Sequence, residues 1–323
     1  MPKEHTARVA VTRKVPGELD IPGARVDVLG DELPARSNVL EFVRGADVLV
    51  CMYTERIDDE LLDAAGRQLR GVCNFAVGVN NIDLQACQRR GVLVTNTPNA
   101  VTEGTADLAW LLILAVARRL IDADRYARSP EYPRRGPLGM AEWLGLDLTG
   151  RTLLIVGAGR IGFATAMRAH AWGMKTLYVA RSKHWEFELA PLAAKRVDLD
   201  EGLAQADVVS IHTPLTPETT HLIDARRLGL MRDRAILVNT SRGPVIDEEA
   251  LAQALHRGAL WGAGLDVYEN EPEIHPDLLD APNTVLTPHI GSAEIRYREM
   301  MTQMVAANVR AILAGEEPPN RVV

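Results

Sequence analysis

The stretch Thr152-Leu-Leu-Ile-Val-Gly-Ala-Gly-Arg-Ile-Gly162 lies near the middle of this chain of 323 residues and decides its fold. Gly157, Gly159 and Gly162 have the spacing G-x-G-x-x-G, directly after an apolar, β-branched run. A helix-compatible stretch, 163–172, follows. Between a strand and a helix, the first glycine permits a tight turn, the second lets the backbone approach a pyrophosphate, and the third lets the helix pack on the strand. The motif therefore predicts a dinucleotide site at a helix N-terminus, and its central position requires a large segment ahead of it.

Composition limits the classes of protein that this chain can belong to. Its 47% hydrophobic and 24% charged residues are typical of a globular protein with a sizeable core, and the length suffices for two domains. The net charge of −7 argues against a broad contact with nucleic acid, although a local basic pocket for a small anion is compatible with it.

The ends and the cysteines indicate a cytoplasmic protein. The N-terminal segment 1–8 has no apolar signal core, and the longest uncharged apolar run, 108–117, is too short to span a bilayer. Cys51, Cys73 and Cys87 lack metal-ligand spacing, so we expect buried small hydrophobes in a reducing compartment and no metal site.

Strand and helix signals alternate along both halves of the chain, which predicts two doubly wound parallel-sheet, Rossmann-like α/β domains. We also expect one long helix over 103–128, a loop over 129–150 and a final amphipathic helix over 293–314. The five strands expected in the first half are 8–12, 25–29, 47–52, 69–75 and 92–95, and the six expected in the second half are 152–156, 175–179, 208–211, 235–239, 262–266 and 285–286.

Three polar residues stand at predicted strand ends in the second half: Arg242, Glu271 and His289. The carboxyl ends of parallel strands line one cleft, so these side chains can converge there. An arginine fork can hold a carboxylate and polarise the adjacent carbonyl, and a histidine can protonate the oxygen that becomes an alkoxide. A glutamate beside the imidazole favours its charged form. Singly, each residue type is more often a surface, capping or solvated group. Together, behind a nucleotide motif, they favour hydride transfer to a 2-oxo acid.

Four linked motifs give this chain a resemblance to the D-isomer-specific 2-hydroxyacid dehydrogenase family over essentially its whole length. In that family the arginine, the histidine and the glutamate just before a proline are catalytic, which implies these roles for Arg242, His289 and Glu271. The motifs are Val156-Gly-Ala-Gly-Arg-Ile-Gly162, Asn239-Thr-Ser-Arg-Gly-Pro-Val-Ile-Asp247, Gly264-Leu-Asp-Val-Tyr-Glu-Asn-Glu-Pro272 and Thr287-Pro-His-Ile-Gly-Ser292.

Within the family, the chain is most similar to the glyoxylate/hydroxypyruvate reductases. Residues 74–83 resemble their substrate loop, whose backbone amides hold the carboxylate, and this places Val77 and Gly78 at the substrate; Asn80 departs from a common aspartate. Residues 94–98 and 105–110 are also similar to that subgroup. Tyr53, after the third predicted strand, is expected to shape the side-chain pocket.

Several alternatives stay open at this point. Three other subfamilies resemble the chain less. Formate dehydrogenases carry glutamine in place of Glu271, and phosphite dehydrogenases usually have a lysine in the substrate loop, where this chain has none. Many phosphoglycerate dehydrogenases carry an additional regulatory domain, for which a chain ending at Val323 has no room. A 2-ketogluconate reductase also stays open, because the sequence does not fix the size of the substrate pocket. The alternative outside the enzymes is a nucleotide-sensing binding module, like the corepressors built on this fold. Such a module would bind nucleotide without turnover.

The resemblance also implies an architecture. The substrate domain would be discontinuous, 1–102 plus 291–323, and the dinucleotide domain would occupy 103–290, with a cleft that closes on the ligands. Such enzymes are commonly homodimers, and we expect the interface along the helix from Glu103 and the 129–150 loop. Trp143 is expected to be a structural tryptophan, or else to reach a partner's active site.

The end of the second strand of the cofactor domain predicts which dinucleotide binds. NAD-binding proteins usually place an Asp or Glu there, but the position is Ala180, and Arg181, Ser182 and Lys183 follow it. Two cations and a hydroxyl suit a 2′-phosphate, so NADP(H) is expected to be preferred and NAD(H) to be possible; the alternative is that both cations are ordinary exposed charges. The other expected cofactor contacts are Arg160, Ile161, Thr105, Thr213, Pro214, Thr240, Ser241, Asp266 and Gly291.

Overall fold

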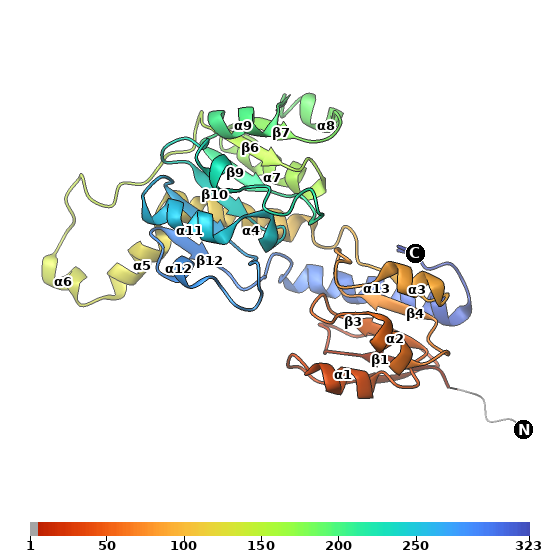
Figure 1. The fold of residues 1–323 in the computed structure, drawn as a ribbon. Coiled ribbons are helices and arrows are strands. Elements are labelled where there is room, and N and C mark those ends of the chain that lie inside the picture. The colour runs from red at the N-terminus through yellow and green to blue at the C-terminus, as the bar shows by residue number, and fades with distance from the viewer. Residues whose placement is uncertain (1–5) are drawn as a thin grey trace, which may run out of the picture. The chain divides into compact units, whose positions relative to one another are not determined.

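The chain forms two compact units in the computed structural model, which describes residues 6–323 (Figure 1). The first unit combines the chain up to Val101 with Ser292–Val323, and the second comprises Thr102–Gly291. Each unit has its own parallel sheet with helices on both faces, so the predicted α/β class with two Rossmann-like sheets is confirmed.

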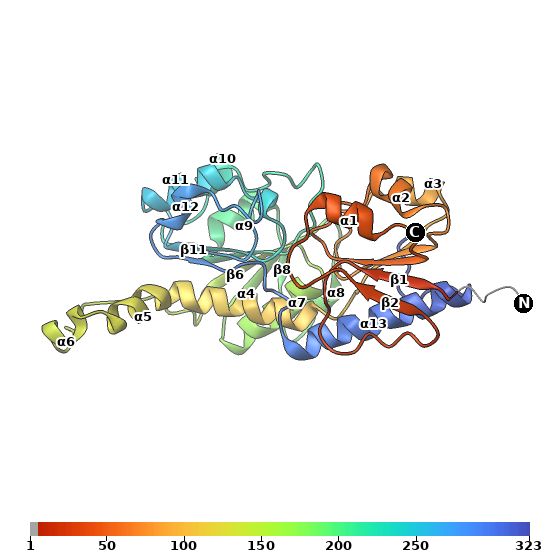
Figure 2. The same cartoon turned by 90° about the horizontal axis from the view of Figure 1, so that it is seen from below.

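The first unit is built on a five-stranded parallel sheet in the order β2-β1-β3-β4-β5, and all five predicted strands are present. Helix α13 covers one face, and α1, α2 and α3 cover the other (Figure 2). The elements are β1 (Arg8–Val11), β2 (Arg25–Val28), α1 (Arg36–Phe42), β3 (Val48–Cys51), α2 (Asp59–Ala65), β4 (Gly71–Asn74), α3 (Leu84–Arg89), β5 (Leu93–Thr95) and α13 (Ile295–Ala314).

Burial on both faces of the sheet explains why the sequences of these strands are continuous apolar runs. In β3 all four residues are buried, and they alternate between two cores. Val48 and Val50 pack in the core that includes α13, while Leu49 and Cys51 pack in the core of α1, α2 and α3. Cys73 and Cys87 are also buried, so all three cysteines are buried side chains, as the sequence predicted.

The second unit is built on a seven-stranded parallel sheet in the order β12-β11-β10-β9-β6-β7-β8. The chain runs outward from β6 in one direction and resumes on its other side with β9, so the strand order reverses between β6 and β9. In open α/β sheets, ligands bind at the carboxyl edge of such a switch point. The strands are β6 (Thr152–Val156), β7 (Lys175–Val179), β8 (Lys195–Arg196), β9 (Val208–Ile211), β10 (Ile236–Asn239), β11 (Gly262–Leu265) and β12 (Thr284–Leu286).

Three details of this unit differ from the expectations. The sheet has a seventh strand, β8, which consists of two exposed cationic residues. Because it has no apolar pattern, the sequence does not predict it. The helix expected over 103–128 is broken at Arg119, whose φ of +52° is left-handed, and the loop expected over 129–150 contains a short helix. The helices are α4 (Thr102–Ala117), α5 (Leu120–Arg128), α6 (Glu131–Arg135), α7 (Arg160–Ala171), α8 (Trp185–Glu188), α9 (Leu199–Gln205), α10 (Ala225–Leu228), α11 (Glu248–His256) and α12 (Pro276–Leu279).

The break separates two parts with different environments. Helix α4 is largely buried against the sheet, whereas α5 has no buried residue. Figure 2 shows α5 and α6 projecting away from the body of the second unit. Trp143 lies against this projection, with its ring 5.2 Å from that of Tyr126 and the Arg119 guanidinium over it.

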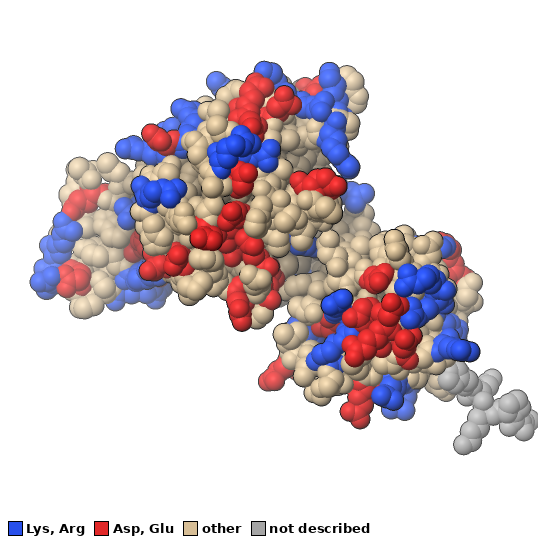
Figure 3. All heavy atoms as spheres, viewed as in Figure 1, with Lys and Arg blue, Asp and Glu red and all other residues tan. Residues whose placement is uncertain are grey.

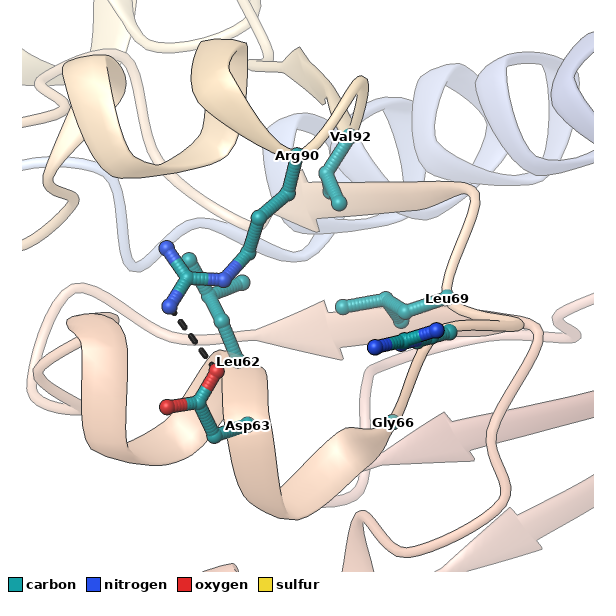
Figure 4. Close-up of a pocket in the computed structure, with 7 residues that line it drawn as sticks. Leu62, Asp63, Gly66, Leu69, Arg90 and Val92 are labelled. Carbon is teal, nitrogen blue, oxygen red and sulfur yellow. Dashed lines mark hydrogen bonds and ion pairs between the residues drawn. The ribbon is translucent and has the colours of Figure 1, made fainter.

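The surface carries charges of both signs. On the face shown in Figure 3, acidic and basic side chains are interspersed. None of the described helices is long and apolar enough to cross a membrane. A cavity of about 500 Å³ opens at the amino ends of β4 and β5, between Leu69, Arg90 and Val92 (Figure 4), which is the edge opposite to the expected substrate loop.

Candidate active site

The turn after β6 has two glycines that no other residue can replace. Gly157 has a φ of +105°, and a Cβ there would lie 2.7 Å from the carbonyl carbon of His212. A Cβ on Gly162 would lie 2.4 Å from the carbonyl oxygen of Gly157. The first glycine therefore lets β6 turn against the end of β9, and the last lets α7 pack on that turn.

Gly159 differs, because a Cβ at this position would meet nothing within 4 Å. The packing of the protein does not demand a glycine there, and its absent side chain leaves open space before α7. Helix α7 begins at Arg160 with no side-chain cap and no acid in its first turn, so the amides of Arg160, Ile161 and Gly162 lack the usual partners. A helix N-terminus with these properties fits a pyrophosphate.

Two threonines at neighbouring strand ends have buried hydroxyls without a partner. Thr213 follows β9 and Thr240 follows β10, and their Oγ1 atoms are two of the seven buried side-chain polar atoms in the described chain that make no hydrogen bond. Leaving a buried hydroxyl unpaired costs free energy, so each of these two hydroxyls can form a hydrogen bond with a bound group. Both residues were expected to contact the dinucleotide, and their environment fits one.

The loop after β7 carries the basic residues that were predicted to bind the 2′-phosphate. Arg196 of β8 donates to the carbonyl oxygens of Ala180 at 2.9 Å and Arg181 at 3.0 Å, which fixes the course of this loop. The Lys183 ammonium lies 3.9 Å from Glu188 and over the Trp185 ring, so its charge is already partnered. A hydrogen bond from Thr216 lowers the pKa of Glu218, and the charge of Arg181 lowers it further.

Asp266 organises the loop that carries His289. Its Oδ1 accepts from the Thr287 hydroxyl at 2.7 Å and the Ile290 amide at 2.8 Å, and its Oδ2 accepts from the Gly291 amide at 2.8 Å. A Cβ on Gly291 would lie 3.2 Å from this carboxylate and 3.3 Å from Thr105, so the glycine relieves a tight contact. Burial raises the pKa of Asp266. The structure therefore gives this expected cofactor contact a bracing role within its own chain.

His289 and Glu271 form an ion pair at the ends of β12 and β11. The Nδ1 atom of His289 lies 2.8 Å from Oε2 of Glu271, and both side chains are partly exposed, at 24% and 27%. The other oxygen of Glu271 accepts from the Tyr268 amide at 3.1 Å. The hydroxyl of Tyr268 donates to the Thr287 carbonyl at 2.9 Å, which ties the loop of Glu271 to the loop of His289. Burial raises the pKa of Tyr268, so this hydroxyl remains a donor.

Arg242 is held by a brace from the last residue of β10. The Asn239 side chain accepts from the amide and hydroxyl of Ser241 at 2.9 and 2.8 Å and donates to the Arg242 carbonyl at 2.9 Å. A Cβ on Gly243 would lie 1.9 Å from the carbonyl carbon of Tyr268. The loop of Arg242 therefore packs directly on the loop of Glu271, and only a glycine permits this approach.

The expected substrate loop belongs to the first unit, and hydrogen bonds fix three of its carbonyls. The carbonyls of Ala76, Val77 and Gly78 accept from the Thr97 amide, the Asn96 side chain and the Asn74 side chain, at 2.9, 2.8 and 2.7 Å. In a trans peptide the N–H points opposite to the C=O, so the amide that follows each carbonyl points away from the donor of that carbonyl. Backbone N–H groups of such a loop can donate to a carboxylate. Tyr53 follows β3 at the same carboxyl edge of this sheet.

Sequence reasoning missed three contributors to the site. Gly243 stands inside a quoted motif, but only the backbone approach to Tyr268 shows why it is a glycine. Tyr268 reads as an ordinary core aromatic, and its hydroxyl bond to Thr287 has no local signal. Arg196 lies in a strand that has no apolar pattern.

Comparison with known proteins decides the family. Residues 110–291 match the model described as "D-isomer specific 2-hydroxyacid dehydrogenase, NAD binding domain". The chain belongs to this family. It is therefore an oxidoreductase, and the resemblance stated from its motifs is confirmed.

Relatives of this chain include glyoxylate reductases. Over 98% of this chain and 95% of the relative, the sequence is 49% identical to a glyoxylate reductase of Thermococcus onnurineus. A solved structure from Thermus thermophilus superposes with a TM-score of 0.92 at 45% identity and covers 98% of this chain and all of that one. The NADPH-dependent glyoxylate/hydroxypyruvate reductase of Sinorhizobium meliloti, solved with NADP and malonate, gives a TM-score of 0.86 at 31% identity, over 98% of this chain and 97% of that one.

Proposed function

We propose that this dehydrogenase reduces a small 2-oxo acid, glyoxylate or hydroxypyruvate, to glycolate or D-glycerate with NADPH. The observation that carries the proposal is the His289–Glu271 ion pair at 2.8 Å, beside the strand ends of the unit that matches the NAD-binding model. The names of its relatives support the substrate class, because they include glyoxylate reductases and a glyoxylate/hydroxypyruvate reductase.

The ion pair supplies the proton. A bound NADPH supplies the hydride that reduces C2 of the substrate. His289 donates the proton from Nε2 to the carbonyl oxygen, so the 2-oxo group gains one hydride and one proton. Nδ1 faces Glu271, whose carboxylate favours the charged imidazole before the transfer.

Arg242 and the substrate loop hold the acid. The guanidinium stabilises negative charge that develops on the carbonyl oxygen and orients the carboxylate. The amides that follow Ala76, Val77 and Gly78 are the second set of donors for the carboxylate, and their carbonyls are already fixed on the opposite side. In this assignment Thr102–Gly291 is the cofactor domain, and the first unit is the substrate domain.

The loop 180–183 supports the preference for NADPH. It has no acid for a ribose hydroxyl, and Arg181 and Ser182 are available to a 2′-phosphate, whereas Lys183 already contacts Glu188. The Sinorhizobium relative described as NADPH-dependent is similar over almost the whole chain.

The projecting segment supports a homodimer. Helix α5 has no buried residue, and Leu144 and Met140 are 62% and 95% exposed. Apolar side chains on a projection of this kind are typical of an interface. Light scattering after size exclusion should give the mass of two chains, and removal of apolar side chains at Met140 and Leu144 should favour the monomer.

The experiment that tests the function is NADPH oxidation across 2-oxo acids of increasing side-chain length, repeated with NADH. We expect the largest kcat/KM with glyoxylate or hydroxypyruvate and NADPH. A preference for a longer acid would overturn the substrate assignment, and an equal or larger kcat/KM with NADH would overturn the cofactor assignment. Nucleotide binding without turnover on any acid would favour the nucleotide-sensing alternative.

A further inference from the structure

Two carboxylates, those of Glu248 and Glu269, form a pair at the loop that carries Glu271. Glu248 is the first residue of α11, and its side chain and that of Glu269 exchange reciprocal hydrogen bonds with each other's backbone. The Glu248 amide donates to Oε1 of Glu269 at 2.8 Å, and the Glu269 amide donates to Oε1 of Glu248 at 2.9 Å. Each acid therefore fixes the backbone of the other.

Helix capping accounts for only one of these two hydrogen bonds, the one that Glu269 accepts. Asp247 already caps α11, because its Oδ1 accepts from the Ala250 amide at 2.9 Å. Glu248 is 5% exposed, and its burial raises the pKa of this carboxyl. A buried acid facing another acid is a costly way to start a helix. Glu269 accepts the first amide of α11, and the Glu248 side chain in return fixes the backbone of the loop.

The loop in question carries the catalytic glutamate. The Tyr268 amide, which donates to Glu271, belongs to the peptide immediately before the Glu269 peptide. The Glu269 backbone is fixed by Glu248, and the Tyr268–Glu269 backbone leaves no room for a Cβ on Gly243. Through these contacts, the position of the Glu271 carboxylate depends on the Glu248–Glu269 pair.

Glu269 also reaches a third segment. Its Oε2 lies 3.1 Å from Nε2 of His221, whose amide donates to the Pro244 carbonyl at 2.8 Å. The charged and titratable groups around the pair include His221, Glu271 and Tyr268. His275 is a further one, and its charge and backbone amide both oppose the effect of burial on the pKa of Glu248. Glu269 therefore joins the start of α11, the segment before α10 and the loop after β10.

We propose that Glu269, together with Glu248, is a positioning residue that holds the Tyr268 amide where it keeps Glu271 on Nδ1 of His289. The inference rests on the proposed role of the His289–Glu271 pair as proton donor. The two acids of this loop therefore have different functions. Glu271 contacts the imidazole, and Glu269 fixes the backbone that positions the Glu271 carboxylate.

The test compares three variants of this loop. Glu269→Ala removes the acceptor for the Glu248 amide, and Glu269→Gln keeps an oxygen there while its amide group can face a neutral His221. Glu273→Ala removes an exposed acid two residues beyond Glu271 and serves as the matched control, since the described structure shows no side-chain bond for it. Misplacement of a catalytic group by about 1 Å can lower the rate about 100-fold.

The expected result is a drop in kcat of at least about tenfold for Glu269→Ala, with the KM for NADPH within about twofold of the parent. The alkaline limb of its kcat/KM profile should move to lower pH, because a displaced Glu271 no longer favours the protonated imidazole. Glu269→Gln and Glu273→Ala should keep the parent profile. A merely structural role would lower the melting temperature without moving the alkaline limb, and that result would overturn the inference.

Failure of the inference and failure of the proposed function are distinguishable. If the parent enzyme reduces glyoxylate and His289→Ala abolishes the reaction, the function stands; an unchanged pH profile in Glu269→Ala then contradicts only the positioning role. If Glu269→Ala does not fold, Glu248→Ala tests the same pair from the other side, and it should show the same shift of the alkaline limb. An unshifted limb in that variant would contradict the inference.

Discussion

The Nδ1 atom of His289 lies 2.8 Å from Oε2 of Glu271, although the two residues follow different strands. Asp266 holds the histidine loop through three hydrogen bonds, and the Tyr268 amide holds the glutamate. Short, fixed contacts of this kind are what a general acid needs, since its partner must be in place before the proton moves.

Arg242 should not be replaceable by lysine. Arg242→Ala should raise the KM for the 2-oxo acid and lower kcat, because the guanidinium both binds the carboxylate and stabilises developing charge. Arg242→Lys should recover little of either, since a point charge cannot form the planar fork. Steady-state kinetics with glyoxylate checks both; full recovery by lysine would contradict a bidentate role.

The first glycine of the turn should respond to substitution differently from the middle one. Gly157→Ala should destabilise the fold by about 1–3 kcal/mol, because its Cβ would lie 2.7 Å from the His212 backbone. Gly159→Ala should leave the thermal melt unchanged, since its Cβ meets nothing within 4 Å, and should weaken NADPH binding. Fluorescence titration with NADPH and a thermal melt measure both effects; unaltered affinity in Gly159→Ala would contradict a pyrophosphate at this turn.

Arg181 should distinguish the two dinucleotides. Arg181→Ala should raise the KM for NADPH about tenfold, which corresponds to the loss of one charge-assisted hydrogen bond to a phosphate. The KM for NADH should stay unchanged. Lys183→Ala is the matched control and should have a smaller effect, because Lys183 already contacts Glu188. Equal losses with both dinucleotides would speak against a 2′-phosphate contact.

Burial of Glu248 should make stability depend on pH. Its pKa in the folded chain is raised above the ordinary value of 4.5, so the folded state binds the proton more tightly than the unfolded state does. Stability contributed by this group is therefore present below its ordinary pKa and is lost as pH rises through the folded value. Glu248→Gln removes the titrating proton, so its urea midpoint should change less than that of the parent between pH 4.5 and pH 7. Parallel pH dependence in both proteins would contradict the raised pKa.

Continuous apolar runs explain how much of the fold was predictable. Residues 48–51 are buried on both faces, as a central parallel strand must be, so their pattern is visible locally. Strand β8 was not predictable, because Lys195 and Arg196 pair with the edge of the sheet and carry no apolar face. The helix break was also invisible, since Arg119 adopts a left-handed φ that usually requires Gly or Asn.

Strand ends explain how much of the site was predictable. Parallel strands present their carboxyl ends at one edge, so Arg242, Glu271 and His289 could be placed at one edge from sequence alone. The role of Glu269 could not, because it depends on contacts with Glu248 and His221 that are 21 and 48 residues away along the chain. Backbone contacts at such separations leave no trace in a local pattern.

The most direct test of the account compares the parent enzyme with His289→Ala in glyoxylate-dependent NADPH oxidation at saturating substrate. Loss of a general acid lowers the rate by about 10²–10⁴-fold. The account predicts a loss of this size in kcat, with the dissociation constant for NADPH unchanged. Turnover within a few-fold of the parent would contradict the assignment of His289 as the proton donor.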